Sequence, residues 1–566
     1  MVNRKLSRIC FVIAWMSIAS LTANAQSFQV QCPPSTITHP GADNNSEPNY
    51  TAPTTYAACT PGKVIPGSLV TCPDSGVYPA THVNGAVKCQ QISGGDGYAT
   101  MADGTQTYMF SFGPLSGLAD IANGLPGTQF PSVFNSEYSG TLQPGDPATT
   151  DKASAAPYMP GNLTGPLSFN YNGAIGQVPD ADCLADAAPG GCASKIAPNG
   201  IDGHVDPRQI MDVGVMNGNI PAPLMAIDED DEFFLTLSNV GMIMRPDLFE
   251  QHTVHFHGYP NASSFYDGVP DASVAINIGA SFTYYYMAPD AGTYFWHCHI
   301  TPPEHLQMGM VGQLYVRPRQ DRVPSTTHLY TALLAQQDDL RTKCDTADVL
   351  CSNPLPSGGD NGKSGGPTVA TGGTGGYAYN DGDGSTWYDV EYPIQIHGFD
   401  PNFHFVGMTF NPEAFADMKD KYFLLNGRSY PDTVTPGPLA TQSTDGAMHY
   451  SQPLNSIINI PAGGKALLRI SDLDVTEYQT LASLGIPMKV IGYNAKLLRD
   501  QEGNNMYYNT NSITLAGGES LDVILDASDT TKYQSGQVFY LYTPNLDHLS
   551  NDAENFGGLM TEVRIN

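Results

Sequence analysis

The sequence predicts an all-β protein with two β-sandwich domains, and three observations support this prediction. Short runs rich in Val, Ile, Phe and Tyr alternate with clusters of Gly, Pro, Asn and Asp, a pattern typical of short strands joined by turns. Glycine and proline are abundant, at 58 and 44 residues, whereas Lys and Arg together number only 25. Few stretches have the periodicity of an amphipathic helix, and short helices are expected only at 330–342 and 412–421.

The first 25 residues have the pattern of a secretory signal. Arg4, Lys5 and Arg8 give a positive start, Ile9–Leu21 is an apolar core, and Ala23-Asn-Ala25 is a small-residue cleavage site. No later apolar run is long enough to span a bilayer. We therefore expect a secreted or periplasmic protein without a membrane partner. Its formal net charge of −30 also argues against nucleic acid as a partner.

Residues 26–98 are rich in Pro, Ser and Thr and hold four cysteines, so we expect a disulfide-stapled N-terminal extension. Of the ten cysteines in the chain, Cys10 lies in the signal and Cys298 lies between two histidines. The other eight fall in neighbouring pairs, although sequence alone does not fix connectivity. Neighbour pairing gives the disulfides Cys32–Cys59, Cys72–Cys89, Cys183–Cys192 and Cys344–Cys351.

The two sandwiches are expected at 99–320 and 321–566. The first carries a large insertion at 116–205, and its order of short strands fits a Greek-key sandwich. Its strands are expected at 108–112, 209–215, 232–237, 252–258, 281–287, 296–299 and 313–316. The second begins with a Gly-rich segment at 352–387, which we expect to be a flexible surface loop. Its strands are expected at 422–425, 454–460, 465–470, 488–493, 512–515, 521–525, 538–542 and 561–565.

Two segments of the first domain concentrate side chains that bind soft and borderline metals. They are HTVHFHG, at 252–258, and HCHITPPEHLQMGM, at 297–310. Cysteine, histidine and methionine are ligands that copper prefers. The two segments together therefore indicate a copper protein.

Strand geometry divides these side chains into two sets. Because side chains alternate between the faces of a strand, His255 and His257 share one face, and His297 and His299 share another. The remaining donors then form a separate set with one thiolate, two imidazoles and a thioether, which is the ligand set of a blue-copper site. This second set is His252, Cys298, His305 and Met310.

The two motifs resemble those of the multicopper oxidases, a family with the cupredoxin fold, over roughly residues 205–566. Thr253 replaces the usual proline of the first motif, and the gap from Cys298 to His305 is longer than usual. The resemblance implies two cupredoxin-like domains, with a type 1 copper in the first of them. Its ligands would be His252, Cys298, His305 and Met310, with Met308 as an alternative axial ligand. A type 2/3 copper site would take His255, His257, His297 and His299.

The activity that the resemblance implies is that of a copper oxidase. A small-molecule or metal-ion reductant would give single electrons to the type 1 copper. The electrons would pass through Cys298 and its flanking histidines to the second site, where dioxygen is reduced to water. Asp267, Asp271 and Glu304 lie near the motifs and could relay protons, but solvated loop carboxylates are the favoured interpretation.

The second domain departs from the family pattern, because it lacks the copper motifs. Aligning 536–543 with 292–299 puts Leu541, Tyr542 and Thr543 where His, Cys and His would be. One chain therefore supplies half of a trinuclear cluster, and three outcomes stay open. A homo-oligomer could pool two sets of histidines. A smaller site, as in copper nitrite reductases, could use a stray histidine. Or the protein could be a non-catalytic cupredoxin that transfers electrons or sequesters copper. The stray histidines are His397, His404, His449 and His548.

Overall fold

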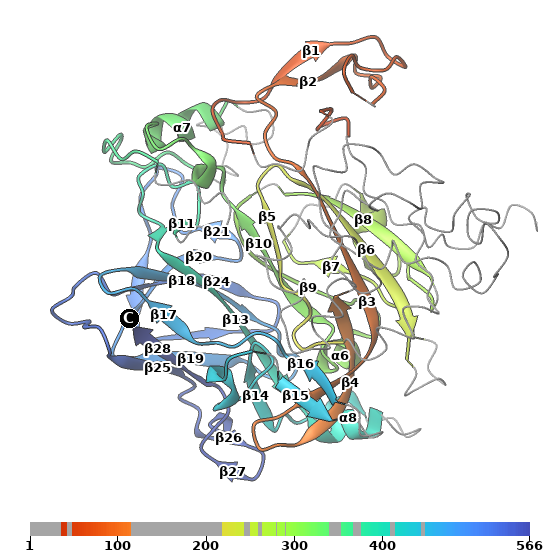
Figure 1. Ribbon diagram of the computed structural model, residues 1–566, viewed down its shortest axis with the longest axis vertical. Coiled ribbons are helices and arrows are strands. Elements are labelled where there is room, and N and C mark those ends of the chain that lie inside the picture. Colours follow the sequence, from red (N-terminus) through yellow and green to blue (C-terminus); the bar gives the residue numbers. More distant parts are fainter. Residues whose placement is uncertain are drawn as a thin grey trace, which may run out of the picture.

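The computed structural model confirms an all-β chain with two sandwiches (Figure 1). Among the residues that it describes, no helix has the length and apolar composition needed to cross a membrane. The structure describes residues 36–41, 48–68, 70–114, 218–242, 250–258, 263–278, 280–288, 290–338, 353–365, 375–407, 414–437, 439–442 and 448–566.

The first sandwich consists of two four-stranded sheets. One has the order β4 (Gln106–Pro114), β3 (Val87–Thr100), β6 (Glu232–Gly241) and β8 (Ser281–Met287). The other has the order β5 (Met225–Asp228), β10 (Val311–Arg317), β9 (Gly292–His297) and β7 (His255–Phe256). Apolar side chains of both sheets pack into one buried core, which includes Phe110, Leu235, Trp296 and Leu314. Strand β3 begins inside the predicted extension, and the domain boundaries stay a prediction.

The second sandwich has a larger pair of sheets. One runs β14 (Tyr422–Leu425), β13 (Val390–Phe399), β18 (Lys465–Asp472), β24 (Ser520–Asp526), β20 (Met488–Tyr493) and β21 (Lys496–Leu497), with β22 (Tyr508–Thr510) also on β20. The other runs β17 (Ile458–Ile460), β28 (Met560–Ile565), β25 (Val538–Tyr542), β19 (Gln479–Leu484) and β23 (Ser512–Leu515). Leu468, Val523, Leu481 and Val563 belong to the core between them.

The remaining elements are short. Paired strands form four small hairpins or ribbons: β1 (Thr55–Ala58) with β2 (Val77–Thr81), β11 (Gly376–Tyr377) with β12 (Trp387–Tyr388), β15 (Leu439–Gln442) with β16 (Met448–Ser451), and β26 (Ser550–Asn551) with β27 (Glu554–Asn555). The described α-helices are α6 (Pro302–Gln307), α7 (Leu329–Gln336) and α8 (Pro401–Gly407). Single 3-10 turns lie at Ser264–Tyr266, Arg319–Arg322, Phe415–Asp417, Asp432–Val434 and Leu546–His548.

Several strands have the bounds that the sequence predicts, and others do not. The strands at 281–287, 422–425, 488–493, 512–515 and 538–542 are confirmed residue for residue. The predicted strand over 252–258 is wrong, because only His255 and Phe256 pair as a strand. The strand over 296–299 is also wrong, because β9 ends at His297 and the chain turns at Thr301, with φ 38°, into α6. The strand predicted at 209–215 lies outside the described residues.

Both predicted helices need correction. The first is present as α7, and it ends at Gln336 rather than running to residue 342, although residues 339–342 lie outside the described part. The second prediction, at 412–421, is wrong for the residues that the structure describes. Residues 414–421 contain only a 3-10 turn at Phe415–Asp417.

The neighbour pairing of the N-terminal cysteines is wrong, because the structure pairs Cys59 with Cys72. Cys59 follows β1 and Cys72 precedes β2, so the hairpin closes its own loop and brings the two Cα atoms to 5.9 Å. The disulfide is nevertheless within the predicted stapled extension. The predicted pairs Cys183–Cys192 and Cys344–Cys351 lie outside the described residues.

The Gly-rich segment at 352–387 is not wholly the surface loop that its composition predicts. In its described part, Tyr377, Asn380 and Asp381 are buried. The carboxylate of Asp381 accepts hydrogen bonds from the backbone N–H groups of Gly384 and Thr386. Polar bonds to a buried aspartate therefore give this segment a fixed conformation that composition alone does not reveal.

The two sandwiches meet through polar contacts. The hydroxyl of Thr293 on β9 donates to Asp522 on β24, at 2.6 Å. Glu391 on β13 accepts hydrogen bonds from Arg317 of the first sandwich at 2.6 Å and from Arg469 of the second at 2.9 Å. Burial alone would raise the pKa of Glu391, but the two guanidinium groups outweigh it and hold the pKa at about 2.

We expect E391Q to lower the free energy of unfolding at pH 7 by about 3–5 kcal/mol, because it removes the carboxylate that the partly buried Arg317 and the buried Arg469 share. The folded pKa lies below the unfolded value of about 4.3, so the contribution is present above that pH and is lost as pH falls towards 2. Urea unfolding across this range should show the parent and variant converging at low pH.

Glu562→Gln is the matched control. Glu562 pairs with Arg564 on the same strand at 2.7 Å, and the guanidinium is more than one-third exposed, so the loss should stay below about 1 kcal/mol. An E391Q protein as stable as E562Q at pH 7 would contradict the assigned role of Glu391.

Candidate metal centre

The structure brings His252, Cys298 and His305 together in the first sandwich. One donor atom from each lies within 4.8 Å of the other two, and all three side chains are fully buried. The thiol sulfur of Cys298 is 3.3 Å from Nδ1 of His305. Cys298 is also the one free cysteine among the described residues.

Each member of this first group is positioned by a different element. His252 pairs with Ile276 through an isolated bridge, Cys298 directly follows β9, and His305 lies in α6. The backbone N–H of Cys298 donates to the carbonyl of Met310 at 3.0 Å, so Met310 lies beside the group through its backbone. Met310 and Met308 are both fully buried.

Burial and neighbouring groups shift the pKa values of both histidines in the first group. Burial lowers the pKa of His252 well below its usual value, and neighbouring His305 adds to this. Burial would lower the pKa of His305 too, but Cys298 and Glu250 raise it to about 9. The carboxylate of Glu250 lies 3.5 Å from Nε2 of His305. Metal binding at His305 would displace any proton from the ligating ring nitrogen.

A second group consists of His255, His257 and His297, again with donors within 4.8 Å of one another. It follows from the pairing of β7 with β9, which sets His255 opposite His297. The ring of His299 is 5.2 Å from that of His255 and 5.4 Å from that of His297. The four histidine rings therefore gather in one place, separate from the first group.

In the second group, the Nε2 atoms of His257 and His297 face each other, and neither carries a proton. Nδ1 of His255 donates to the carbonyl of Asp267 at 2.7 Å, and Nδ1 of His297 donates to the carbonyl of Cys298 at 2.7 Å. A neutral imidazole has one N–H, so Nε2 of His297 is a lone pair. It lies 3.0 Å from Nε2 of His257.

Nε2 of His257 also carries a lone pair, for the same reason. Its other ring edge faces the backbone of Gly518 in the second sandwich, and a hydrogen bond to that backbone acts on its pKa. Burial, with His255 and His299, lowers the pKa of His257 to about 4. Neutral imidazoles that turn Nδ1 to a carbonyl and Nε2 to a common point are the arrangement that binds a metal ion.

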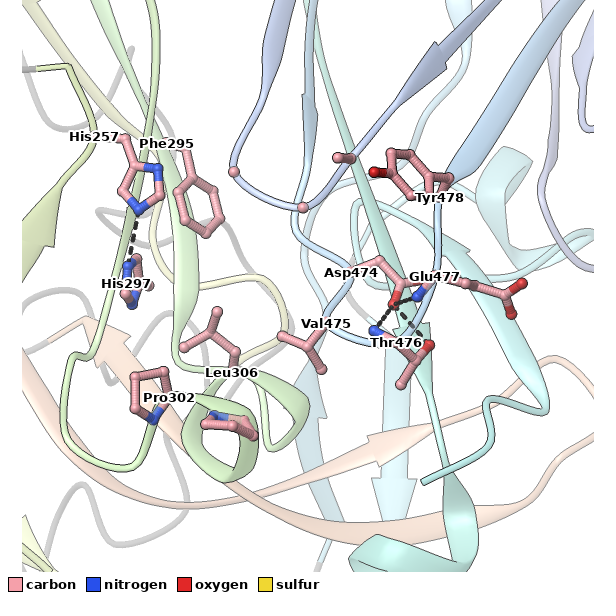
Figure 2. A pocket seen from close by; sticks show the side chains of 14 residues that line it. His257, Phe295, His297, Pro302, Leu306, Asp474, Val475, Thr476, Glu477 and Tyr478 are labelled. Carbon is pink, nitrogen blue, oxygen red and sulfur yellow. Dashed lines mark hydrogen bonds between the residues drawn. The ribbon is translucent and has the colours of Figure 1, made fainter. Parts of the chain in front are cut away.

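A cavity of about 440 Å³ opens on the second group from the interface of the sandwiches. Figure 2 shows His257 and His297 on one wall and the loop of Asp474, Thr476 and Glu477 on the other. Phe295, Leu306 and Val475 give the cavity an apolar lining between them. The second group therefore faces the second sandwich across an open space.

The stray histidines contact other parts of the molecule. Nε2 of His397 donates to the carbonyl of Leu306, and His404 lies between the carbonyls of Tyr108 and Gln307. His548 bonds to Gln479 on β19. The backbone of His449 lies on β16, and its side chain is outside the described part. None of the three described rings belongs to either donor group.

The predicted proton-relay residues differ in their position. Asp267 touches the second group through its carbonyl, and its carboxylate is 3.7 Å from Nδ1 of His255. Asp271 is exposed and Glu304 lies half-buried at the start of α6.

Sequence reasoning missed the residues that make room for or support the donor groups. Gly94 on β3 is one of them, because a Cβ there would lie 2.5 Å from Cδ2 of His252. Glu250 and Gly518 are others. No motif marks them, since they are distant in sequence from the histidines they meet; only the Gly-Gly pair within a strand pattern at 94–95 hints at a close approach.

Comparison with known proteins finds similarity in the part of the chain that carries both histidine motifs. Residues 202–321 match the family model of the multicopper oxidases. The multicopper oxidase MCE of Talaromyces pinophilus is 32% identical over 149 residues, covering 26% of this chain and 21% of that protein. Laccase 1 of Metarhizium acridum is 29% identical over 147 residues, covering 26% and 21%. Laccase-1 of Emericella nidulans is 36% identical over 111 residues, covering 19% and 16%. The matches thus span about a fifth of the length of each relative.

We expect G94A to displace the ring of His252, because the new methyl group would overlap it. The affinity of the apo-protein for copper(II) at the thiolate site should fall about tenfold or more. Titration against a competing chelator, followed by thiolate-to-metal absorption, measures this. Gly358→Ala is the control, since nothing lies within 4 Å of a Cβ there. Equal affinities of the two variants would show that Gly94 has no part in placing His252.

Proposed function

We propose that this chain, whose residues 202–321 match the family model of the multicopper oxidases, is an exported copper-dependent oxidase. A reductant gives single electrons at the first donor group, and dioxygen is reduced to water at the second. The observation that carries the proposal is the peptide connection between the groups. Cys298 of the first group is bonded directly to His297 of the second and to His299.

The residues present fit copper at the first group. Both ring nitrogens of His252 lack a hydrogen-bond partner although the side chain is completely buried, and unpaired buried polar atoms cost free energy unless something binds them. Cysteine with two histidines and a weak methionine is a copper-selective set. We assign His252, Cys298, His305 and Met310 to this site. Bound copper would supply one-electron redox chemistry there.

Two polar groups contact the sulfur of Cys298. The backbone N–H of Thr253 donates to the sulfur at 3.4 Å, and His305 lies on another side of it. Full burial excludes water and strengthens both interactions. The sulfur is therefore prepared as a metal ligand and joined through backbone bonds to two imidazoles of the second group.

The second site would be held by His255, His257, His297 and His299. One chain offers these four imidazoles, and in the described residues the stray histidines His397, His404 and His548 are bonded elsewhere. His255, His257 and His299 are only partly buried. We therefore propose that a second copy of the chain supplies the missing ligands across a two-fold axis.

The copper content, the absorption spectrum and oxygen uptake test the function. We expect more than one copper per chain, a blue absorption band and oxygen consumption with a phenolic or metal-ion reductant. C298S should lose the blue band, because the band requires the thiolate, and should lose oxygen uptake with it. A band that persists in C298S would overturn the assignment. One copper per chain, a blue band and no oxygen uptake would instead identify an electron carrier.

The oligomeric state tests the shared cluster separately. Light scattering on the copper-loaded protein should find a dimer or a higher symmetric assembly. His255→Gln, at the partly buried edge of the second group, should abolish oxygen uptake but keep the blue band, because the first group does not include His255. A copper-loaded monomer that still reduces dioxygen would sink the proposal of a shared cluster.

A further inference from the structure

The C-terminal end of α6 is bound by side chains of the second sandwich. The N–H at Nε2 of His397, on β13, donates to the carbonyl of Leu306 at 2.9 Å. Because a carbonyl oxygen can only accept, this bond places the ring proton of His397 on Nε2. His404, on α8, has its ring between the carbonyls of Gln307 at 3.0 Å and Tyr108 at 2.7 Å. A neutral ring has one N–H, so His404 donates to one of these two carbonyls at a time.

The side chain of Gln307 adds two more bonds to the same interface. Its amide nitrogen donates to Asp420 at 3.0 Å, and its amide oxygen accepts the backbone N–H of Asp400 at 3.0 Å. Gln307, Asp400 and His404 are buried. The two residues after His305 therefore depend on the second sandwich for several of their polar contacts.

This interface holds the segment that carries two members of the first donor group. Helix α6 is six residues long and begins at a left-handed residue without a side-chain cap, so its own hydrogen bonds give it little independent stability. His305 precedes the bound carbonyls and Met310 follows them. The backbone N–H of Met310 donates to the carbonyl of His305 at 2.9 Å, which ties both residues to this turn.

We infer that His397 and His404 are positioning residues for the first metal site, acting through the carbonyls of Leu306 and Gln307. The inference rests on the proposed function, because the site that they position is the proposed copper site. It gives the second sandwich, which lacks copper motifs, a direct part in shaping the copper ligands of the first. Partners behind the ligands of a metal site commonly set its affinity in this way.

His548 serves as a control that distinguishes a role in positioning α6 from simple packing in the core. His404 stacks on Phe399 with ring centroids 3.7 Å apart, and His548 stacks on Phe423 at the same 3.7 Å. Both are buried histidines of the second sandwich. His548 bonds to Gln479 and lies 3.3 Å from Glu477, neither of which belongs to α6.

The test compares H397L, H397Q and H548L in the full chain. Leucine removes the donor to Leu306, whereas the amide nitrogen of glutamine can reach the position of Nε2. Each metal-free variant is titrated with copper(II) against a competing chelator, and the thiolate-to-copper absorption of Cys298 reports binding. We expect H397L to bind about 10–100-fold more weakly than the parent, with a shifted band. H397Q and H548L should stay close to the parent.

The expected pattern is specific to a hydrogen bond on α6. H397L and H548L with equal affinity, or H397Q as weak as H397L, would overturn the inference. Urea unfolding of the metal-free variants shows whether each is folded. If H397L does not fold, His397→Asn replaces it, since asparagine keeps an amide but is too short to reach Leu306 and should also bind weakly. A parent-like H397N would then overturn the inference.

Failure of the proposed function gives a different result. In that case the parent itself shows no thiolate-to-copper band, or the band survives in C298S. A parent with a Cys298-dependent band and an H397L variant with unchanged affinity and band would reject only the positioning role of the second-sandwich histidines.

Discussion

The end of strand β9 is the constraint on which both donor groups depend. Pairing with β7 sets His297 opposite His255, and pairing with β10 brings the next residue, Cys298, against the carbonyl of Met310. Consecutive side chains at this point face opposite sides, so a single peptide bond separates the two groups. The core beneath β9, with Trp296 fully buried, keeps this strand in register.

The second sandwich contacts both donor groups. In the described residues, it supplies no metal-binding side chain to either of them. Gly518 approaches His257 closely enough that any side chain there would collide with the ring. His397 and His404 contact the helix that carries His305. Buried polar bonds such as Thr293 to Asp522 fix the two sandwiches against each other. The second domain therefore lacks the copper motifs, but its residues still contact the elements that carry the donor groups.

Much of this arrangement could be predicted from local sequence pattern. The expectation that His255 and His257 share a face, and that His297 and Cys298 face opposite ways, comes from the two-residue period of a strand. The two donor groups of the structure divide in the same way. The strand bounds were predicted best where turn residues flank a clear β-rich run, as at 488–493 and 538–542. Contacts between residues distant in sequence were not predictable. Glu250 beside His305 carries no local signal, and only the Gly-Gly pair at 94–95 marks Gly94 beneath His252. The Cys59–Cys72 pairing depends on how a hairpin closes.

We propose that one cysteine, Cys298, joins two metal sites at the end of strand β9. Anomalous diffraction at the copper absorption edge, from crystals of copper-loaded protein, tests it most directly. We predict two separate sets of copper peaks, one bonded to the sulfur of Cys298 with His252 and His305, and one at the Nε2 atoms of His255, His257 and His297. Copper peaks at only one of these groups, or none within bonding distance of Cys298, would contradict the claim.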